Sequence, residues 1–365
     1  MPELVDHYRD ILLSGAPLMD TRAPVEFDLG SFPTAESLPL MTDAERAAVG
    51  TCYKQKGQEA AIRLGHELVH GKTKEQRVAA WVDFARRHPE GYLFCFRGGL
   101  RSQIVQQWMA EAGVKYPRIA GGYKALRRFL IDTTDQAMAD CSLLLVSGMT
   151  GTGKTELLVR LENAVDLEGH AQHRGSSFGR HAHPQPTPIN FENALAIDLL
   201  RQRHAGHWQL VVEDENQTIG RLALPQSLIG KMEVSPLVVL DAPFAQRVER
   251  ILKDYVIDLR GEFLDQQGLE AGHAAFAEHL QAAMDRIRKR LGGERHQRLS
   301  RILQEALACK DFSASLDQHR QWITTLLEEY YDPMYHHHEK QKQGRILFRG
   351  EAQAVEDFIR QQYPG

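Results

Sequence analysis

No apolar run in this chain approaches the roughly 20 residues that a helix needs to cross a bilayer. The N-terminal sequence MPELVDHYRD also lacks the basic region followed by an apolar one that marks a secretory signal. We therefore expect a cytoplasmic protein with no membrane partner.

Cysteine is scarce as well. The four cysteines, Cys52, Cys95, Cys141 and Cys309, lie far apart, and no two of them form a CxxC pair. This spacing favours neither a disulfide framework nor a zinc site, and a reducing compartment fits it best. In such a compartment one thiol can serve as a nucleophile, and the other three are expected to be structural.

The chain also contains no internal repeat and no long low-complexity segment. Its 365 residues favour at least two domains. Strand and helix patterns alternate up to about Thr133, and they alternate again after the polar segment TDQAMADC. Because such alternation is typical of parallel sheets, we predict one α/β domain at residues 1–133 and a second at residues 134–365. The second domain is expected to end in a helical and basic C-terminal region.

The net charge of −4 argues neither for nor against a nucleic-acid partner, so the distribution of charge matters more. One segment, RIRKRLGGERHQRLSR, is strongly basic. Its side chains are candidates for RNA contact, and the alternative is a helix face that is only solvated. The candidates are Arg286, Arg288, Lys289, Arg290, Arg295 and Arg298.

The sequence GMTGTGKT matches the phosphate-binding pattern GxxxxGK[ST] at every fixed position. It lies between an apolar strand pattern, SLLLVSG, and a helical one, GTGKTELLVRLENA, which is the context the motif needs. Glycines let backbone N–H groups curl around a phosphate, the lysine supplies a mobile cation, and the threonine hydroxyl can hold a magnesium ion. The predicted phosphate-binding residues are Gly148, Gly151, Gly153, Lys154 and Thr155.

Acidic residues follow two further apolar strand patterns, WQLVVEDE and SPLVVLDAP. In an open parallel sheet, ligands bind beyond the carboxyl ends of the strands, so these carboxylates are candidates for the metal side of the phosphate site. They are Glu213, Asp214, Glu215 and Asp241, and the alternative is ordinary solvated acids in turns. The segment HRGSSFG is either a second anion-binding loop, through Arg174, Ser176 and Ser177, or a surface turn.

The sequence GYLFCFRGGLRS surrounds one thiol with arginines and glycines. Cys95 follows a buried-strand pattern and precedes a helical one, SQIVQQWMAEAG. Positive charge and a helix N-terminus stabilise a thiolate, and paired glycines let the loop turn its N–H groups toward the sulfur. The alternative is a buried structural cysteine. The predicted catalytic residues are Cys95, Arg97, Gly98, Gly99, Arg101 and Ser102.

Two family resemblances follow from these motifs. CFRGGLRS resembles the active-site loop of rhodanese-type sulfurtransferases, and LMDTRAPVEF resembles the strand and turn near the start of that fold. With GMTGTGKTELL, DLEGHAQHRGSSFG, LVVLDAPFAQRVERI and YYDPMY, the chain is similar over nearly its whole length to the bacterial tRNA 2-selenouridine synthases. The resemblance implies a rhodanese-like first domain and a P-loop NTPase-like second domain.

The second resemblance implies a two-step modification of tRNA whose wobble uridine is already thiolated at carbon 2. A geranyl group from geranyl diphosphate is first attached to that sulfur, and selenium from selenophosphate then replaces the geranylthio group. Cys95 would hold selenium as a perselenide before delivery. The implied substrates are the tRNAs for lysine, glutamate and glutamine, and a selenophosphate-producing enzyme would act upstream. Magnesium is expected at most at the phosphate loop, with no redox cofactor, and we expect a monomer.

Two other functions stay open from the sequence. One is an ATP-dependent tRNA sulfurtransferase or persulfide-relay enzyme, and the other is a nucleotide-sensing RNA-binding module. An intact Cys95 and an intact GKT sequence argue against the non-catalytic alternative, because a site that has lost its catalytic activity needs neither.

Overall fold

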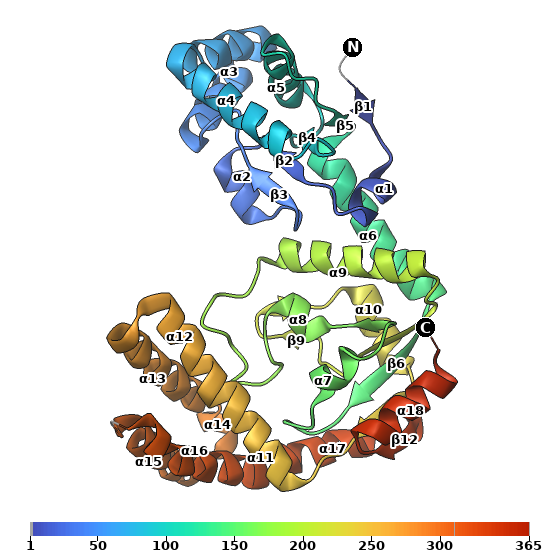
Figure 1. The fold of residues 1–365 in the computed structure, drawn as a ribbon, viewed down its shortest axis with the longest axis vertical. Helices are drawn as coiled ribbons and strands as arrows, with labels where there is room; N and C mark the ends of the chain where they lie inside the picture. Colours follow the sequence, from blue (N-terminus) through green and yellow to red (C-terminus); the bar gives the residue numbers. More distant parts are fainter. Residues whose placement is uncertain (1–2, 310, 365) are drawn as a thin grey trace. The chain divides into compact units, whose positions relative to one another are not determined.

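The computed structural model describes residues 3–309 and 311–364. The chain divides into two compact units: Met1–Gln136 with Thr187–Arg201, and Ala137–Pro186 with Gln202–Gly365 (Figure 1). This differs from the expected division at residue 133, because the second unit is interrupted in sequence by a helix that packs with the first. The polar segment expected as a linker is helical, since helix α6 runs without a break from Gly122 to Asp140. The hydroxyls of Thr133 and Thr134 donate to carbonyls one turn back, which satisfies these polar groups within the helix.

The first unit contains a five-stranded sheet in the order β1-β5-β4-β2-β3, in which every neighbouring pair is parallel. Its strands are short because the chain crosses to a helix after two or three paired residues. Their bounds are Leu4–Val5 for β1, Leu18–Asp20 for β2, Ala35–Ser37 for β3, Tyr92–Phe94 for β4 and Arg118–Ile119 for β5. The parallel sheet predicted from the alternating patterns is therefore confirmed for this unit.

Helices cover both faces of this sheet because successive strand residues point to opposite sides. Phe94 packs with α1, α6 and α9 in one apolar cluster, and its neighbour Leu93 packs with α4 and α5 in the other. The helices of this unit are α1 (Tyr8–Leu13), α2 (Pro24–Leu29), α3 (Asp43–Leu68), α4 (Gly71–Arg87), α5 (Leu100–Glu111), α6 and α9 (Pro188–Ala205).

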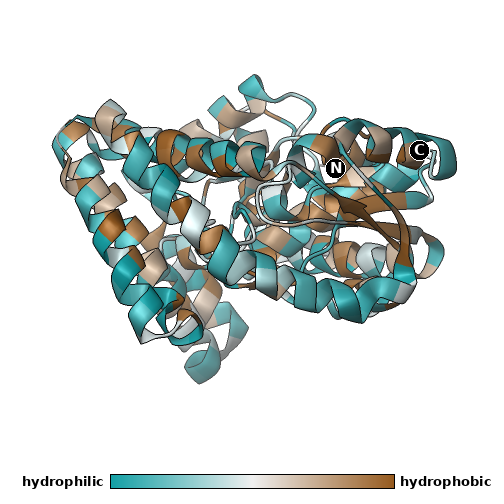
Figure 2. Ribbon diagram, turned by 90° about the horizontal axis from the view of Figure 1, so that it is seen from below, coloured by the Kyte–Doolittle hydropathy of each residue, from teal (hydrophilic) through white to brown (hydrophobic). Residues whose placement is uncertain are grey.

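The second unit contains another parallel five-stranded sheet, in the order β12-β11-β6-β8-β7. The bounds are Ser142–Ser147 for β6, Ala164–Val165 for β7, Gln209–Glu213 for β8, Leu237–Leu240 for β11 and Ile346–Gly350 for β12. The inner strands β6, β8 and β11 are largely buried, in keeping with the apolar strands coloured brown in Figure 2. The edge strand β12 differs, because its residues alternate between half-buried and exposed. A small antiparallel hairpin, β9 (Thr218–Ile219) and β10 (Leu222–Ala223), lies outside this sheet.

The helix expected across GTGKTELLVRLENA is short, since α7 covers only Lys154–Leu158. The chain turns after it because the Asn163 amide donates to the carbonyls of Gln209 and Tyr363. That anchor sets β7 beside β8, and β7 was not expected from the sequence. Helix α18 (Ala352–Gln362) packs with α7 over one face of the sheet.

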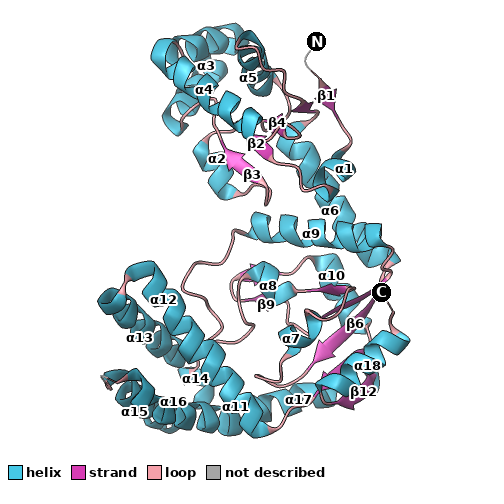
Figure 3. Ribbon diagram, in the orientation of Figure 1, coloured by secondary structure: helices cyan, strands magenta, loops and turns pink. Residues whose placement is uncertain are grey.

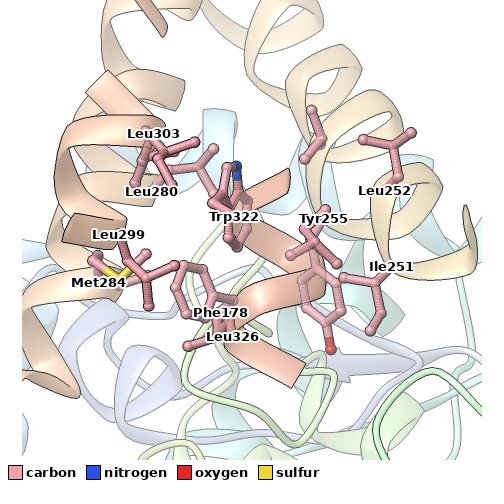
Figure 4. Packing of buried hydrophobic residues seen from close by; sticks show 14 of the residues in the cluster. Phe178, Ile251, Leu252, Tyr255, Leu280, Met284, Leu299, Leu303, Trp322 and Leu326 are labelled. Carbon is pink, nitrogen blue, oxygen red and sulfur yellow. The ribbon is translucent and has the colours of Figure 1, made fainter. Parts of the chain in front are cut away.

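Between β11 and β12 the described residues form helices alone (Figure 3). They enclose a separate apolar core around Trp322 and Phe276, in which Phe178 from the HRGSSFG segment also packs (Figure 4). The elements are α11 (Phe244–Leu252), the π-helical η1 (Lys253–Asp258), α12 (Leu259–Gln267), α13 (Leu269–Arg286), α14 (Arg288–Leu291), α15 (Gly293–Ala308), α16 (Phe312–Leu326), the π-helical η2 (Leu327–Tyr331), α17 (Asp332–Lys342) and the 3₁₀ turn η3 (Gln343–Arg345). Helices α8 (Leu167–Ala171) and α10 (Gln226–Val234) complete the unit.

In the described ranges, no helix is long and apolar enough to cross a membrane.

A buried ion pair fixes the carboxyl end of β2 in the first unit. The Arg22 guanidinium donates to both carboxylate oxygens of Asp20, and neither side chain is more than 2% exposed. Arg22 also donates to the Gly30 carbonyl and lies 3.8 Å from the centre of the Tyr123 ring. Every charged group in this cluster is thus paired within the protein interior.

We predict that Asp20→Ala lowers the free energy of unfolding of the first unit by about 3–5 kcal/mol, because it leaves the Arg22 charge buried without its partner. Hydrogen exchange of peptides from the first unit, followed by mass spectrometry, measures this loss. Glu59→Ala is the control, since it breaks an exposed pair with Arg63 and should leave exchange unchanged. Equal exchange in both variants would contradict the structural role of the pair.

Candidate functional site

Cys95 lies at the carboxyl end of β4, in the loop that leads to α5. Its side chain is buried, and Sγ lies 3.2 Å from Ser102 Oγ, within hydrogen-bond distance. The backbone on both sides is held: Thr21 donates to the Phe94 carbonyl, and the Tyr123 N–H donates to the Cys95 carbonyl. The structure therefore places the predicted cysteine and serine side by side at a fixed strand end.

The two glycines of this loop have different roles. Gly98 has φ +62°, and a Cβ there would lie 2.7 Å from the Gly121 nitrogen, so only glycine fits. Gly99 has open space around it and instead precedes α5, where its carbonyl accepts a hydrogen bond from the Ser102 hydroxyl. A third glycine, Gly122, was missed from the sequence; a Cβ there would lie 2.2 Å from the Cys95 carbonyl oxygen.

The positive charge beside Cys95 comes from a different set of arginines than expected. Arg97 is exposed, and its guanidinium lies 5.8 Å from the Phe96 ring. Arg101 is largely buried and pairs with Glu26, which it contacts at 2.6 and 3.2 Å. Arg118, which the sequence did not single out, donates to the Gly98 carbonyl.

Electrostatics near the thiol follow from this arrangement. Burial opposes the charge of Arg101, but Glu26 and a negative Cys95 outweigh it and raise the pKa of Arg101. Burial lowers the pKa of Arg118, and a negative Cys95 counteracts that effect. Both guanidiniums therefore interact electrostatically with the Cys95 side chain.

In the second unit, the predicted phosphate loop joins β6 to α7. Its glycines have φ values between +82° and +155°, and a Cβ on Gly148 or Gly151 would collide with a backbone oxygen at 2.7 or 2.8 Å. Lys154 folds back, and its Nζ donates to the Gly148 carbonyl at 3.2 Å. Thr155 is exposed at the start of α7. All five predicted residues line one cavity.

Two arginines of α11 hold this loop in shape. Arg247 Nε donates to the Thr150 carbonyl, and the same guanidinium pairs with Asp332 at 2.5 Å. Arg250 donates to the Gly151 carbonyl at 2.7 Å and pairs with Glu156. The sequence motif did not reveal these two arginines, because they lie 97 and 99 residues further along the chain than the carbonyls they contact.

Buried carboxyl groups surround Lys154. Burial and the nearby Glu215 raise the pKa of Glu168 to about 8, and the carboxyl groups of Glu168 and Glu215 share a hydrogen bond. Burial also raises the pKa of Glu215, and burial raises the pKa of Glu213 as well. Burial alone would lower the pKa of Lys154, but Tyr335 and these carboxyl groups outweigh it and raise that pKa. Lys154 therefore stays cationic.

Two of the expected metal-side carboxylates, Asp214 and Asp241, form ion pairs with basic side chains. Both oxygens of Asp214 accept from Lys342, at 2.7 and 2.8 Å, and one also accepts from the Ser147 hydroxyl. Asp241 pairs with Arg349 and does not line the cavity. Among the residues that the structure describes, no group of three or more histidine, cysteine or acidic side chains could hold a metal ion.

The cavity around the phosphate loop has a volume of about 1560 Å³ and lies within the second unit. Arg174, Ser176 and Ser177 of the HRGSSFG segment line it together with the phosphate loop. Its wall also carries Tyr255, together with Tyr330, Tyr331, Met334 and Tyr335 of the YYDPMY sequence. Phosphate-binding and apolar surface thus meet in one cavity.

The basic segment divides into two groups. Arg286 and Arg290 line the large cavity, and Arg286, Arg288 and Lys289 line a smaller hollow of about 470 Å³. Arg295 and Arg298 instead bond to Glu329, so their charges are compensated within the protein. The structure therefore separates four candidates for RNA contact from two that form ion pairs.

Comparison with known proteins identifies the relatives of this chain. Residues 141–364 match the family model described as the tRNA 2-selenouridine synthase AAA domain. A tRNA 2-selenouridine synthase of Pseudomonas fluorescens (strain Pf0-1) is 60% identical over 358 residues, which cover 98% of this chain and 97% of the relative. Those of Azotobacter vinelandii and Bordetella petrii are 58% and 55% identical, and the alignments cover 97% of this chain and 96% and 95% of the relatives. The chain therefore belongs to the tRNA 2-selenouridine synthase family.

Proposed function

We propose that this enzyme converts 2-thiouridine at the wobble position of tRNA into 2-selenouridine, with geranyl diphosphate and selenophosphate as co-substrates. The observation that carries the proposal is the presence in one chain of a phosphate loop with a half-buried lysine and of a buried thiol at a parallel strand end. Membership of the family supports the same overall reaction.

The first unit acts as a rhodanese-like domain in this proposal. Its parallel five-stranded sheet and the Cys95 loop between β4 and α5 support that assignment. Arg101 and Arg118 place positive charge beside the thiol, and Ser102 holds its side chain in place.

The phosphate loop of the second unit takes the diphosphate of the prenyl donor. The sulfur of 2-thiouridine attacks carbon 1 of the geranyl group, the C–O bond breaks, and diphosphate leaves with the bonding electron pair. Lys154 and the loop amides stabilise that developing charge. Tyr335 and Met334 offer apolar surface for the terpene chain in the same cavity. Pockets for small ligands usually have about 300–1,000 Å³, so the 1560 Å³ here accommodates a donor and a nucleotide together.

Cys95 releases selenide from selenophosphate in a step that needs no oxidant. Selenium in selenophosphate is already at the selenide level, so a perselenide on Cys95 would require the removal of two electrons. We therefore assign the thiolate as a nucleophile on phosphorus: an S–P bond forms, the P–Se bond breaks, and selenide leaves with the electron pair. Selenide then adds to carbon 2 of the alkylated uridine, the geranylthiolate departs and takes up a proton, and water hydrolyses the phosphorylated cysteine.

We predict that Cys95→Ser abolishes selenium incorporation and leaves geranylation largely intact, because the phosphate loop belongs to the other unit. Mass analysis of tRNA nucleosides after incubation with each donor separately and together measures both steps. Cys52→Ser is the matched control, since Cys52 lies on α3 away from the Cys95 loop. Normal amounts of selenouridine from the Cys95 variant would rule out its role.

We expect Lys154→Ala to weaken the binding of inorganic diphosphate by about tenfold to a hundredfold, because it removes the half-buried cation that lines the cavity. Titration calorimetry on the full chain measures the dissociation constant. Lys340→Ala serves as control, since Lys340 is exposed on α17 and does not line the cavity. An unchanged affinity of Lys154→Ala for diphosphate would show that the phosphate loop does not take part in the reaction. ATP hydrolysis stimulated by tRNA in the unsubstituted chain would favour the sulfurtransferase alternative.

The Glu168–Glu215 pair gives diphosphate binding a pH dependence. Glu168 has a pKa of about 8, so the pair keeps its shared proton below that pH and loses it above. Deprotonation adds a negative charge beside Lys154, and affinity for inorganic diphosphate should fall severalfold as the pH rises through about 8. Glu168→Gln should flatten this profile, whereas Glu249→Gln, an exposed residue paired with Arg320, should not. Parallel profiles in all three proteins would contradict the assignment.

A further inference from the structure

We propose that residues 174–177, together with Tyr331, form a second phosphate-binding subsite in the large cavity, which takes a backbone phosphate of the RNA strand. The subsite rests on the proposed function, in which the phosphate loop holds the small donor. Three observations carry it: an unpartnered tyrosine hydroxyl, an unpartnered arginine nitrogen and a loop that several contacts hold in place.

The Tyr331 hydroxyl lacks a partner inside the protein. The side chain is only 6% exposed and lines the cavity, and within the described residues its oxygen makes no hydrogen bond. Ser176 and Ser177 lie near enough to affect its titration, but neither meets it in ordinary hydrogen-bond geometry. Because burial raises the pKa of Tyr331, the hydroxyl keeps its proton and can donate it to an anion.

Arg174 presents a donor to the same space. Its Nη2 donates to Glu262 at 3.2 Å, and its guanidinium lies 5.8 Å from the centre of the Tyr255 ring. These contacts fix the plane of the guanidinium. They leave Nη1 buried and, within residues 3–309 and 311–364, without a hydrogen-bond partner. An oriented arginine with a vacant donor is a typical phosphate ligand.

The loop that carries these groups is rigid. Phe178 stacks on Trp322 with ring centres 5.4 Å apart, which anchors the loop in the helical core (Figure 4). The Tyr255 hydroxyl donates to the Arg174 carbonyl and accepts from Ser176, both at 3.2 Å. Arg286 donates to the Ser177 carbonyl at 2.7 Å. The subsite is therefore preorganised, so little ordering is required when an anion binds.

Burial and nearby cations oppose protonation of the groups beside this loop. Burial and then Arg180 lower the pKa of His173 to about 4. Burial, Arg286 and Arg180 likewise lower the pKa of His279 to about 4. Burial and Arg180 lower the pKa of Arg286 itself. Acidic groups lie close by as well: Glu262 pairs with Arg174, and Asp254 lines the same cavity. The proposal therefore rests on the two vacant donors and the contacts that hold the loop.

The basic segment points to RNA as the source of that phosphate. Arg286 lines both the large cavity and the smaller hollow formed with Arg288 and Lys289. The basic surface therefore continues from the outside of α13 and α14 to the carbonyl of Ser177. A strand with regularly spaced phosphates can follow such a surface, whereas a single small anion is already provided for at the phosphate loop.

Tyr331→Phe and Arg174→Met test the subsite in the full chain, with a synthetic anticodon stem–loop RNA containing 2-thiouridine as the probe. Each should weaken RNA binding about tenfold, and Arg174→Met should reduce the slope of log affinity against log salt by about 0.7–0.9. Tyr331→Phe should keep its full thermal stability, because the hydroxyl has no internal hydrogen bond to lose. Tyr255→Phe is the matched control: it loses two internal hydrogen bonds and should melt at a lower temperature.

Inorganic diphosphate provides the second measurement. Both test variants should bind it as the unsubstituted chain does, because it occupies the loop around Lys154. If Arg174→Met weakens diphosphate as much as Lys154→Ala does, residues 174–177 belong to the small-donor site and the proposal is wrong. Unchanged RNA affinity and salt slope in both variants would overturn it as well. Failure of the unsubstituted chain to bind diphosphate would count against the proposed function alone.

Discussion

The balance of charge around Lys154 is the constraint on which the large cavity depends. Its half-buried ammonium group is partly removed from water and must be balanced nearby, and here the balance comes from Glu168 and Glu215, which share one proton. Gly175 is part of the same arrangement. It has φ +64°, and a Cβ there would lie 2.2 Å from Glu168 Oε1 and 3.0 Å from Glu215 Oε1. The carboxyl pair and residues 174–177 therefore have to be in place together, and the phosphate loop is coupled to the second anion loop through packing.

The Cys95 loop meets the same demand by other means. It places a thiol at a strand end beside two guanidiniums: Arg101 pairs with Glu26, and Arg118 donates to the Gly98 carbonyl. What fixes the sulfur is close backbone packing, in which Gly98 and Gly122 allow two segments to touch where any side chain would separate them. One unit thus relies on steric fit and the other on charge balance. Substitutions in the two loops should accordingly fail for different reasons, by distorting the backbone in one and by unbalancing charge in the other.

The sequence predicted the parts of the sites that are local in the chain. Cys95 with Ser102 and the glycines around Lys154 were found because strand, loop and helix follow one another directly. The supporting groups could not be found in this way. Arg247 contacts Thr150, which lies 97 residues earlier in the chain, and Arg118 contacts Gly98, which lies 20 residues earlier. Arg97 is exposed in the structure, and spacing along a loop does not fix the direction of a side chain. The parallel sheets were predictable from alternation, but the return of α9 to the first unit was not, because its apolar residues fit either core.

Two π-helical turns explain why tyrosines of the helical core also reach the cavity. Tyr255 lies in η1 and Tyr331 in η2, and both belong to the apolar cluster around Trp322 while also lining the phosphate cavity. A π-helical turn holds more residues than an α-helical one, so it shifts the register of side chains on either side of it. The ring of each tyrosine can then stay in the core while its hydroxyl faces polar groups. Because the turn is less favourable than a regular α-helix, its occurrence at two cavity-facing tyrosines argues that their hydroxyls have a function in the cavity beyond packing.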